Sequence, residues 1–200
     1  MTDAPAAATA LVLATHNPHK VDELRRILGA DLGSLELVVY NGPEPIEDGV
    51  TFAENALIKA RAAAVHTGLA ALADDSGIAV DALGGAPGIH SARYAGTRRS
   101  EDNVALLLER MRGVQDRRAV FVCAAAAVLP DGSEHVEVAE WPGEVLEQPA
   151  GGGGFGYDPV FRPDGLAVSS AEISAAEKDA ISHRRQAFSA LLPWLRERLG

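Results

Sequence analysis

The stretch Leu11-Val-Leu-Ala-Thr-His-Asn-Pro-His-Lys20 joins a short apolar strand to the start of a helix. Its first residues, 11–14, are all apolar and predict a buried strand. Asn17 is a favoured N-cap, and Pro18 suits the first helical position because an N–H there would have no partner. Apolar residues then recur at helical spacing as far as Leu28. A strand followed at once by a helix is the unit from which α/β folds are built.

Strands and helices continue to alternate beyond this unit. We predict a strand at 35–40 and an Ala-rich helix from 52 to 66. Two short apolar stretches, 69–73 and 78–80, predict strands on either side of an acidic turn. Ser100 is predicted to cap the helix that follows.

The last third of the chain predicts a strand pair and a final helix. Residues 119–129 and 135–141 are extended stretches joined by Pro130-Asp-Gly132, a good turn sequence. Apolar residues from 188 to 199 keep helical spacing. Because a hairpin pairs its strands antiparallel, we expect an α/β fold with a mixed sheet instead of a purely parallel one.

Length, composition and charge limit the classes of protein. The 200 residues predict a flexible tail at 1–10 followed by a single domain at 11–200. The net charge of −10 argues against a nucleic-acid polymer as partner, although a small anion needs only a few local positive groups.

Three further features point to a protein of the cytoplasm. The longest apolar run, 119–129, is too short to cross a membrane. The first residues have no Lys or Arg before an apolar stretch, so no secretory signal is predicted. The only cysteine, Cys123, lies inside that apolar run, where it is expected to be a core residue and a poor nucleophile.

The loop between the first strand and its helix is the first candidate for chemistry. The free amides and the positive dipole end of the helix attract an anion. Thr15 adds a hydroxyl group, and Lys20 adds a full positive charge in the first turn. The same sequence equally suits an ordinary capped helix with an exposed lysine.

Acidic and polar residues in the middle of the chain suggest a metal. The adjacent carboxylates of Asp74 and Asp75 suit Mg²⁺, a hard cation that takes oxygen ligands. Because side chains alternate along an extended chain, these two should face opposite ways, one toward a metal or water and the other bracing the turn. Asn55 and Lys59 project from one helix face and are candidates to line a polar cleft. A plain turn and a solvated helix face are the alternatives.

Two glycine-containing loops follow. The loop at 84–94 carries Arg93, which suits either a phosphate or a structural ion pair. The run 151–159 formally matches G-x-G-x-x-G, but no strand precedes it and no helix follows, so a dinucleotide site is rejected. Phe155 or Tyr157 in this run is suited to stack on a base or, alternatively, to fill the core.

A group of donors precedes the last helix. Ser182 is a credible N-cap, and Lys178, His183 and Arg184 lie close to it in sequence. Such donors suit the oxygen of a 6-oxopurine, whereas the amino group of adenine would face them as another donor. The six histidines lack zinc-site spacing, and neither a P-loop nor a G-x-S-x-G motif occurs.

Six motifs, taken together and in this order, resemble the inosine triphosphate pyrophosphatases, also called dITP/XTP pyrophosphatases. Each motif is weak alone, whereas six in family order over most of the chain are specific. The motifs are Ala14-Thr-His-Asn-Pro-His-Lys20, Thr51-Phe-Ala-Glu-Asn55, Ala73-Asp-Asp-Ser-Gly77, Gly84-Gly-Ala-Pro-Gly88, Gly154-Phe-Gly-Tyr-Asp-Pro159 and Ser182-His-Arg184.

The resemblance implies a two-lobed α/β fold, with helices flanking a long mixed sheet and the active-site cleft between the lobes. It implies a homodimer that requires Mg²⁺ and hydrolyses ITP, dITP and XTP to the monophosphate and pyrophosphate. It also implies that Asp75, Lys20 and Lys59 are catalytic and that Asp75 and Glu47 hold the metal. The substrate-binding residues it implies are Thr15, His16, Asn17, Pro18, His19, Lys20, Asn55, Ser76, Phe155, Gly156, Tyr157, Asp158, Lys178, His183 and Arg184.

The resemblance also suggests a mechanism. We expect Mg²⁺ to neutralise charge on the phosphates while Asp75 activates a water that attacks the α-phosphorus. Lys20 and Lys59 then stabilise the leaving pyrophosphate. Two rivals stay open: a related pyrophosphatase for pyrimidine or modified nucleotides, and a nucleotide-binding sensor without turnover. The Asp74-Asp75 pair and Glu47 argue against the sensor.

Overall fold

The computed structural model describes residues 9–199 of the chain. Most of the predicted tail, residues 1–8, lies outside the described residues, whereas Thr9 and Ala10 belong to the first strand. No helix within 9–199 combines the length and the apolar character needed to span a membrane.

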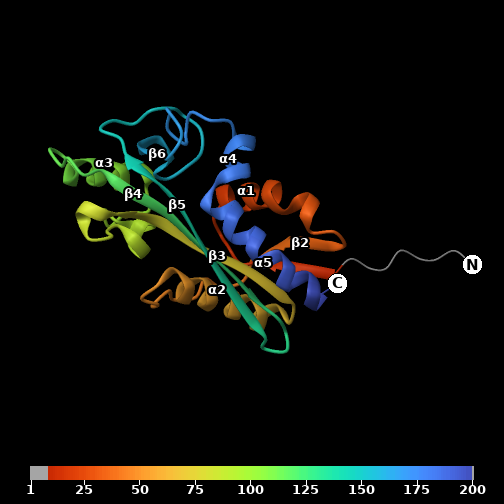
Figure 1. Cartoon of the computed structure of the whole chain (residues 1–200). Helices are drawn as coiled ribbons and strands as arrows, with labels where there is room; N and C mark the ends of the chain where they lie inside the picture. The colour runs from red at the N-terminus through yellow and green to blue at the C-terminus, as the bar shows by residue number, and fades with distance from the viewer. Residues whose placement is uncertain (1–8, 200) are drawn as a thin grey trace, which may run out of the picture.

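One six-stranded mixed sheet forms the centre of the molecule, in the order β2-β1-β3-β4-β5-β6 (Figure 1). Strand β1 pairs in parallel with both β2 and β3, and the remaining neighbours pair antiparallel. The mixed α/β sheet predicted from the sequence is therefore confirmed. The strands are β1 (Thr9–Leu13), β2 (Leu35–Val39), β3 (Ala70–Val80), β4 (Arg118–Val128), β5 (Glu134–Val145) and β6 (Phe161–Pro163).

Helices flank this sheet. The α-helices are α1 (Pro18–Leu28), α2 (Phe52–Thr67), α3 (Ser100–Arg110), α4 (Ala175–Ile181) and α5 (His183–Leu199). The short 3₁₀ helices are η1 (Gly29–Asp31), η2 (Asp81–Leu83), η3 (Gly88–Arg93) and η4 (Asp158–Val160). The predicted cap of α1 is confirmed, because the Asn17 side chain accepts a hydrogen bond from the His19 backbone N–H and Pro18 opens the helix. Ser100 is not a cap: it is the first residue of α3, and Arg99 takes the N-cap position.

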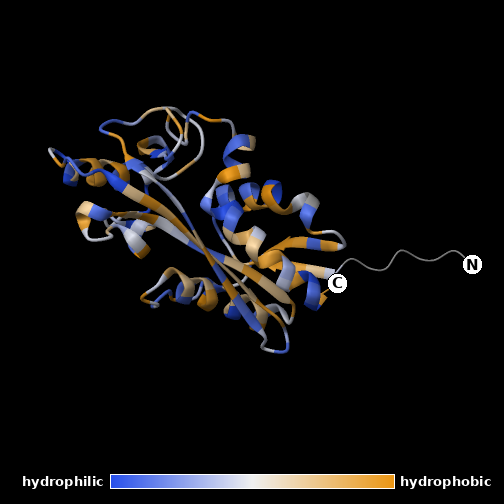
Figure 2. Ribbon diagram, viewed as in Figure 1, coloured by the Kyte–Doolittle hydropathy of each residue, from blue (hydrophilic) through white to orange (hydrophobic). Residues whose placement is uncertain are grey.

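Three apolar clusters divide the molecule into two lobes. In the first lobe, α1 and α5 pack on one face of the sheet, whereas α2 packs on the other through small alanines. In the second lobe, the far ends of β3, β4 and β5 pack against α3 and β6 around Phe121 and Phe161. Figure 2 shows the mixed hydropathy of α1 and α5, whose apolar residues pack on the sheet.

Strand β3 runs through both lobes without a break, and this corrects one prediction. We expected two short strands around an acidic turn at Asp74–Gly77. Instead, Asp74 pairs with Ala125 and Gly77 pairs with Val122 in a continuous antiparallel ladder with β4. The carboxylates can lie inside a strand because cationic side chains meet them on both faces of the sheet.

Candidate active site

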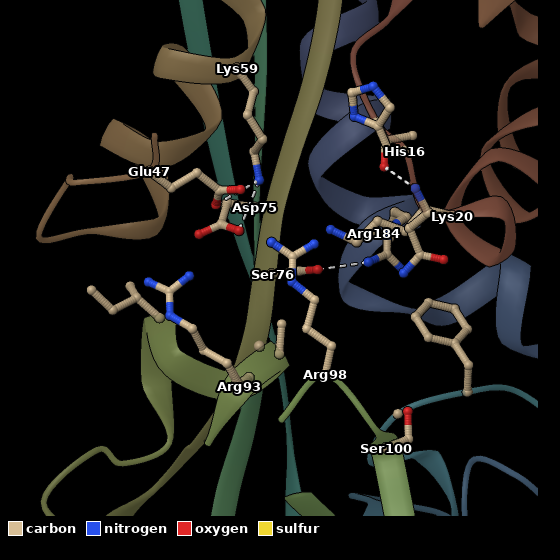
Figure 3. Close-up of a pocket in the computed structure, with 18 of the residues that line it drawn as sticks. His16, Lys20, Glu47, Lys59, Asp75, Ser76, Arg93, Arg98, Ser100 and Arg184 are labelled. Atoms are coloured by element: carbon tan, nitrogen blue, oxygen red, sulfur yellow. Dashed lines mark hydrogen bonds and ion pairs between the residues drawn. The ribbon is translucent and has the colours of Figure 1, made fainter. Parts of the chain in front are cut away.

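A cavity of about 400 Å³ lies between the two lobes, at the middle of β3. Strand β1 ends at Leu13, but its parallel neighbour β3 continues to Val80. The chain therefore leaves the sheet after Ala14, whose N–H donates to the carbonyl of Leu72, and opens a gap beside the acidic part of β3. Side chains from both lobes line this gap (Figure 3).

The start of α1 forms one wall of the cavity. Thr15, His16, Asn17 and Lys20 all line it. The Lys20 ammonium lies 2.9 Å from Asp74, and the Asn17 side chain is used to cap the helix. The positive end of the helix dipole and the Lys20 charge thus lie at the cavity wall, as an anion site requires.

Asp75, Lys59 and Glu47 form a second group on the opposite face of β3. The Lys59 ammonium lies 3.0 Å from the Asp75 carboxylate and 3.3 Å from that of Glu47. Burial raises the pKa of the Asp75 carboxyl above its ordinary value, and the charge of Glu47 adds to this effect. Burial alone would lower the pKa of Lys59, but the charges of Asp75, Asp74 and Glu47 outweigh it and raise that pKa.

Asn55 supports this group from beneath. Its side-chain carbonyl accepts a hydrogen bond from the Gly49 N–H at 2.9 Å, and its amide donates to Asp75 at 3.4 Å. Asn55 is buried and does not line the cavity. It therefore fixes the loop that carries Glu47 and orients the Asp75 carboxylate.

The carboxylate oxygens at this end of the cavity suit a hard cation whose remaining ligands come from water and a bound phosphate. The Asp75 and Glu47 carboxylates both line the cavity, on either side of Lys59. Proteins hold Mg²⁺ with one or two carboxylates together with water and substrate phosphates. Within residues 9–199 no group of three or more His, Cys, Asp or Glu side chains is arranged to hold a metal. These two carboxylates therefore suit a Mg²⁺ ion that binds together with the phosphates of a ligand. They suit less well a metal ion whose ligands all come from the protein.

Asp74 points to the other face of the sheet, as the alternation of side chains predicts. It is buried and meets Lys20 at 2.9 Å and Arg184 at 3.1 Å. Although burial opposes ionisation, Lys20 and Arg184 hold the pKa of this carboxyl well below its usual range. Arg184 also contacts Glu23 at 2.6 Å, so Asp74 braces a buried charge network and does not face the Asp75 group.

The glycine-rich loop closes the opposite end of the cavity. Asp158 accepts hydrogen bonds from the Phe155 N–H at 2.8 Å and from the Lys178 ammonium at 2.5 Å. These bonds fix the Phe155 ring against Lys178, 5.0 Å from its ammonium, and beside the stacked ring of His19. Tyr157 instead packs into the core of the second lobe, and its hydroxyl donates to the Ser91 carbonyl at 2.9 Å. Of the two roles predicted for these rings, Phe155 is placed to contact a ligand in the cavity, whereas Tyr157 mainly fills the core.

The donors before α5 are more constrained than the sequence suggests. His183 is buried, stacks on Phe121 at a ring distance of 4.8 Å, and has a pKa far below its usual value because of burial and the nearby charge of Arg184. It is therefore neutral near pH 7 and is not a cationic donor. Ser182 behaves as the predicted cap, because its hydroxyl accepts a hydrogen bond from the Arg185 N–H at 3.3 Å.

Most of the predicted site residues meet at this cavity. Those that line it are Thr15, His16, Asn17, Lys20, Glu47, Lys59, Asp75, Ser76, Phe155, Gly156, Tyr157, Asp158, Lys178, His183 and Arg184. Pro18, His19 and Asn55 do not line it: Pro18 starts α1, His19 stacks on Phe155, and Asn55 braces Asp75.

Sequence reasoning missed three residues that bear on the site. Glu23 is buried and pairs with Arg184, although its position on α1 resembles that of an ordinary polar residue. Arg98 and Glu44 line the cavity from opposite lobes and pair with each other at 3.5 Å. Neither lies in a motif, so only their charge could have drawn attention to them.

The fold and the cavity define a class of protein: a two-lobed α/β protein in which carboxylates and cations from several elements converge between the lobes. A profile of the Ham1 family matches residues 11–194, and the chain belongs to that family.

The chain is similar over almost its whole length to curated and solved relatives. A dITP/XTP pyrophosphatase from Leifsonia xyli subsp. xyli is 52% identical over 93% of this chain and 95% of its own. One from Frankia alni is 55% identical over 94% of this chain and 97% of its own. The solved Ham1 protein of Staphylococcus aureus superimposes with a TM-score of 0.84 at 36% identity, covering 94% of this chain and 99% of its own. The two-lobed fold is thus the fold of solved Ham1 proteins.

The buried network generates a prediction about stability. Replacing Arg184 with Met would leave Glu23 and Asp74 buried without their shared partner. We expect Arg184→Met to lower the free energy of unfolding by about 3–5 kcal/mol, measured by urea denaturation. The control is Arg61→Met, which breaks an exposed pair with Glu134 and should cost at most about 1 kcal/mol. Equal losses for the two variants would show that the buried network does not stabilise the fold.

Proposed function

We propose that this protein hydrolyses deaminated purine nucleoside triphosphates (ITP, dITP and XTP) to the monophosphate and pyrophosphate. One observation carries the proposal: an anion-facing helix start, a carboxylate pair suited to a metal, and a ring flanked by cations all line one cavity. A triphosphate, a metal and a base need these three environments side by side. The curated relatives named dITP/XTP pyrophosphatase support the same activity. Nothing in the cavity favours a pyrimidine nucleotide or a sensor without turnover.

The proposed reaction is attack of water on the α-phosphorus. A new bond forms from the water oxygen to the α-phosphorus, the bond to the bridging oxygen breaks, and pyrophosphate leaves. Asp75 is placed to accept the proton of the water, because burial and Glu47 raise the pKa of its carboxyl and make it a better base. Lys59, held in the charged form beside Asp75, and Lys20, at the start of α1, stabilise the negative charge of the leaving group.

We further propose that Mg²⁺ serves this reaction, with Asp75 and Glu47 as its protein ligands. When bound, it would neutralise charge on the phosphates. The two carboxylates that line the cavity support this role. Asn55, which donates to Asp75, helps to hold that carboxylate in place.

Selection of the base is assigned to the end of the cavity beside Phe155. Arg184 donates to the Ser76 hydroxyl at 2.7 Å, and the Lys178 ammonium lies over the Phe155 ring. A base bound beside Phe155 would present its edge to these donors. An oxygen at that edge gains hydrogen bonds, whereas the amino group of adenine leaves donor facing donor.

We propose a homodimer on the strength of the family resemblance, and a cytoplasmic location on the single core cysteine and the first residues, which predict no secretory signal. Light scattering coupled to size-exclusion chromatography measures the oligomeric state directly. We also propose that no nucleic-acid polymer binds, which agrees with the net charge of −10.

A panel of nucleoside triphosphates tests the proposed activity. With ITP, XTP, ATP, GTP and CTP compared at equal concentration, we expect kcat/KM for ITP and XTP to exceed that for ATP by about 100-fold or more. Release of pyrophosphate together with the monophosphate is the readout. Equal rates for all five substrates, or release of orthophosphate alone, would exclude the proposed function.

Removal of the Asp75 charge tests the catalytic assignment. Asp75→Asn should lower kcat for ITP by about 10³-fold or more, because the base and a metal ligand are lost together. The fold should survive, since Asn has nearly the same shape. The matched control is Asp81→Asn, an exposed carboxylate just after β3, which should keep its activity. Near-normal turnover by Asp75→Asn would refute the assignment.

Metal removal tests the cofactor. Treatment with excess EDTA is expected to abolish pyrophosphate release from ITP, and added Mg²⁺ should restore it fully. Circular dichroism should show an unchanged fold throughout, because Lys59 already compensates the Asp75 charge without a metal. Full activity in EDTA would rule out a divalent cation in this reaction.

A further inference from the structure

Two arginines of the second lobe line the cavity opposite the catalytic group. Arg93 ends η3, and Arg98 lies in the segment between η3 and α3. Figure 3 shows both guanidinium groups pointing from this segment toward Asp75 and Ser76, with Arg93 on the side of Glu47. Neither arginine belongs to the catalytic or base-binding groups described above.

Most of the other cations at the cavity are already committed to carboxylates. Lys20 pairs with Asp74, and Lys59 pairs with Asp75. Lys178 and Arg184 are likewise held by buried carboxylates of the first lobe and the glycine-rich loop. Because each of these cations is compensated by a carboxylate, the pairs contribute little net positive charge to attract a ligand with several negative charges.

Arg93 and Arg98 supply the charge that these pairs lack. Among residues 9–199, no carboxylate oxygen lies within 4.0 Å of the Arg93 guanidinium nitrogens. Arg98 has only Glu44, at 3.5 Å, and its side chain is 77% exposed. An exposed pair at this distance contributes little, so a ligand phosphate competes with Glu44 easily.

The backbone around Arg93 is held firmly although its side chain is free. The Ser91 hydroxyl donates to the Gly88 carbonyl at 2.6 Å and accepts from the Ile78 N–H of β3 at 3.0 Å. The Tyr157 hydroxyl donates to the Ser91 carbonyl, and Asn103 of α3 donates to the Ala92 carbonyl at 3.2 Å. Buried polar groups therefore fix the peptide on both sides of an unpaired guanidinium.

The close approach of η3 to β3 has a further cause in Gly77. A Cβ atom at this position would lie 2.6 Å from the Gly88 carbonyl oxygen and would also collide with the Ser91 side chain. Only glycine lets the two segments pack this closely. A preorganised backbone that presents an unpaired arginine to a cavity favours binding, since little order is lost when a ligand arrives.

We infer that Arg93 and Arg98 bind the polyphosphate chain of the substrate from the second lobe, facing Lys20 and Lys59 of the first. The inference rests on the proposed function for the identity of the ligand. The planar guanidinium group forms paired hydrogen bonds with phosphate oxygens, which a lysine cannot do. Both arginines line the same cavity as Lys20 and Lys59, so contacts from both lobes to one polyphosphate are possible.

Calorimetric titration with inorganic tripolyphosphate tests this inference on the full chain, with and without Mg²⁺. Arg93→Gln and Arg98→Gln should each weaken tripolyphosphate binding by about tenfold, the effect of one charge-assisted hydrogen bond. The matched control is Arg99→Gln, which removes the same charge from a side chain that is 72% exposed and does not line the cavity. It should change the affinity by less than about twofold, as expected for a screened surface charge.

Inosine monophosphate is the control ligand. Because it has a single phosphate and binds through the base end, its affinity should stay within about twofold in all three variants. A variant that binds tripolyphosphate as well as Arg99→Gln overturns the assignment of that arginine, and so does an equal loss for inosine monophosphate. Thermal melting should be unchanged, since both side chains are exposed.

The same measurements separate this inference from the proposed function. If the wild type binds tripolyphosphate through Arg93 but does not hydrolyse ITP, the arginine site stands and the proposed function fails. If the wild type hydrolyses ITP while both variants bind like Arg99→Gln, the function stands and the arginine site fails. No binding of tripolyphosphate by the wild type under either condition also overturns the inference.

Discussion

The structure depends on one constraint: two adjacent carboxylates lie in the middle of a strand that crosses the whole molecule. Asp74 and Asp75 point to opposite faces of β3, so each must be compensated by different elements. Lys20 and Arg184 reach Asp74 on one face, and Lys59 reaches Asp75 on the other. The positions of α1, α2 and α5 around the sheet follow from this requirement as well as from their apolar faces.

The two faces then take different roles. On the face of Asp74 the carboxylate is buried, and Glu23 pairs with the same arginine, Arg184. This buried network suits a structural role. On the face of Asp75 the two carboxylates, Asp75 and Glu47, line the cavity, which suits contact with a metal, a phosphate or water. A single Asp-Asp dipeptide thus supplies both the frame and the reactive group, because the alternation of a strand separates its two side chains.

The motifs predicted much of the site, though not its internal order. Thr15, Lys20 and Lys59 line the cavity as expected, because helix caps and helical spacing place side chains reliably from nearby sequence. The sequence could not show that His183 is neutral, since that depends on Phe121 from another strand packing against its ring. Nor could the sequence show that Phe155 lies at the cavity while Tyr157 packs in the core, because that difference depends on how the loop packs against the second lobe.

What the sequence alone determined is local: the strand before α1, the cap at Asn17, the hairpin turn and the order of the six motifs. The tertiary structure alone decided that β3 continues through its carboxylates, that Arg184 joins Glu23 and Asp74 across 161 and 110 positions of the chain, and that Arg93 stays unpaired among the described residues. The physical reason is range. Propensity and capping act between near neighbours, whereas the compensation of a buried charge depends on whichever distant cation the packing of the lobes brings within a few ångströms.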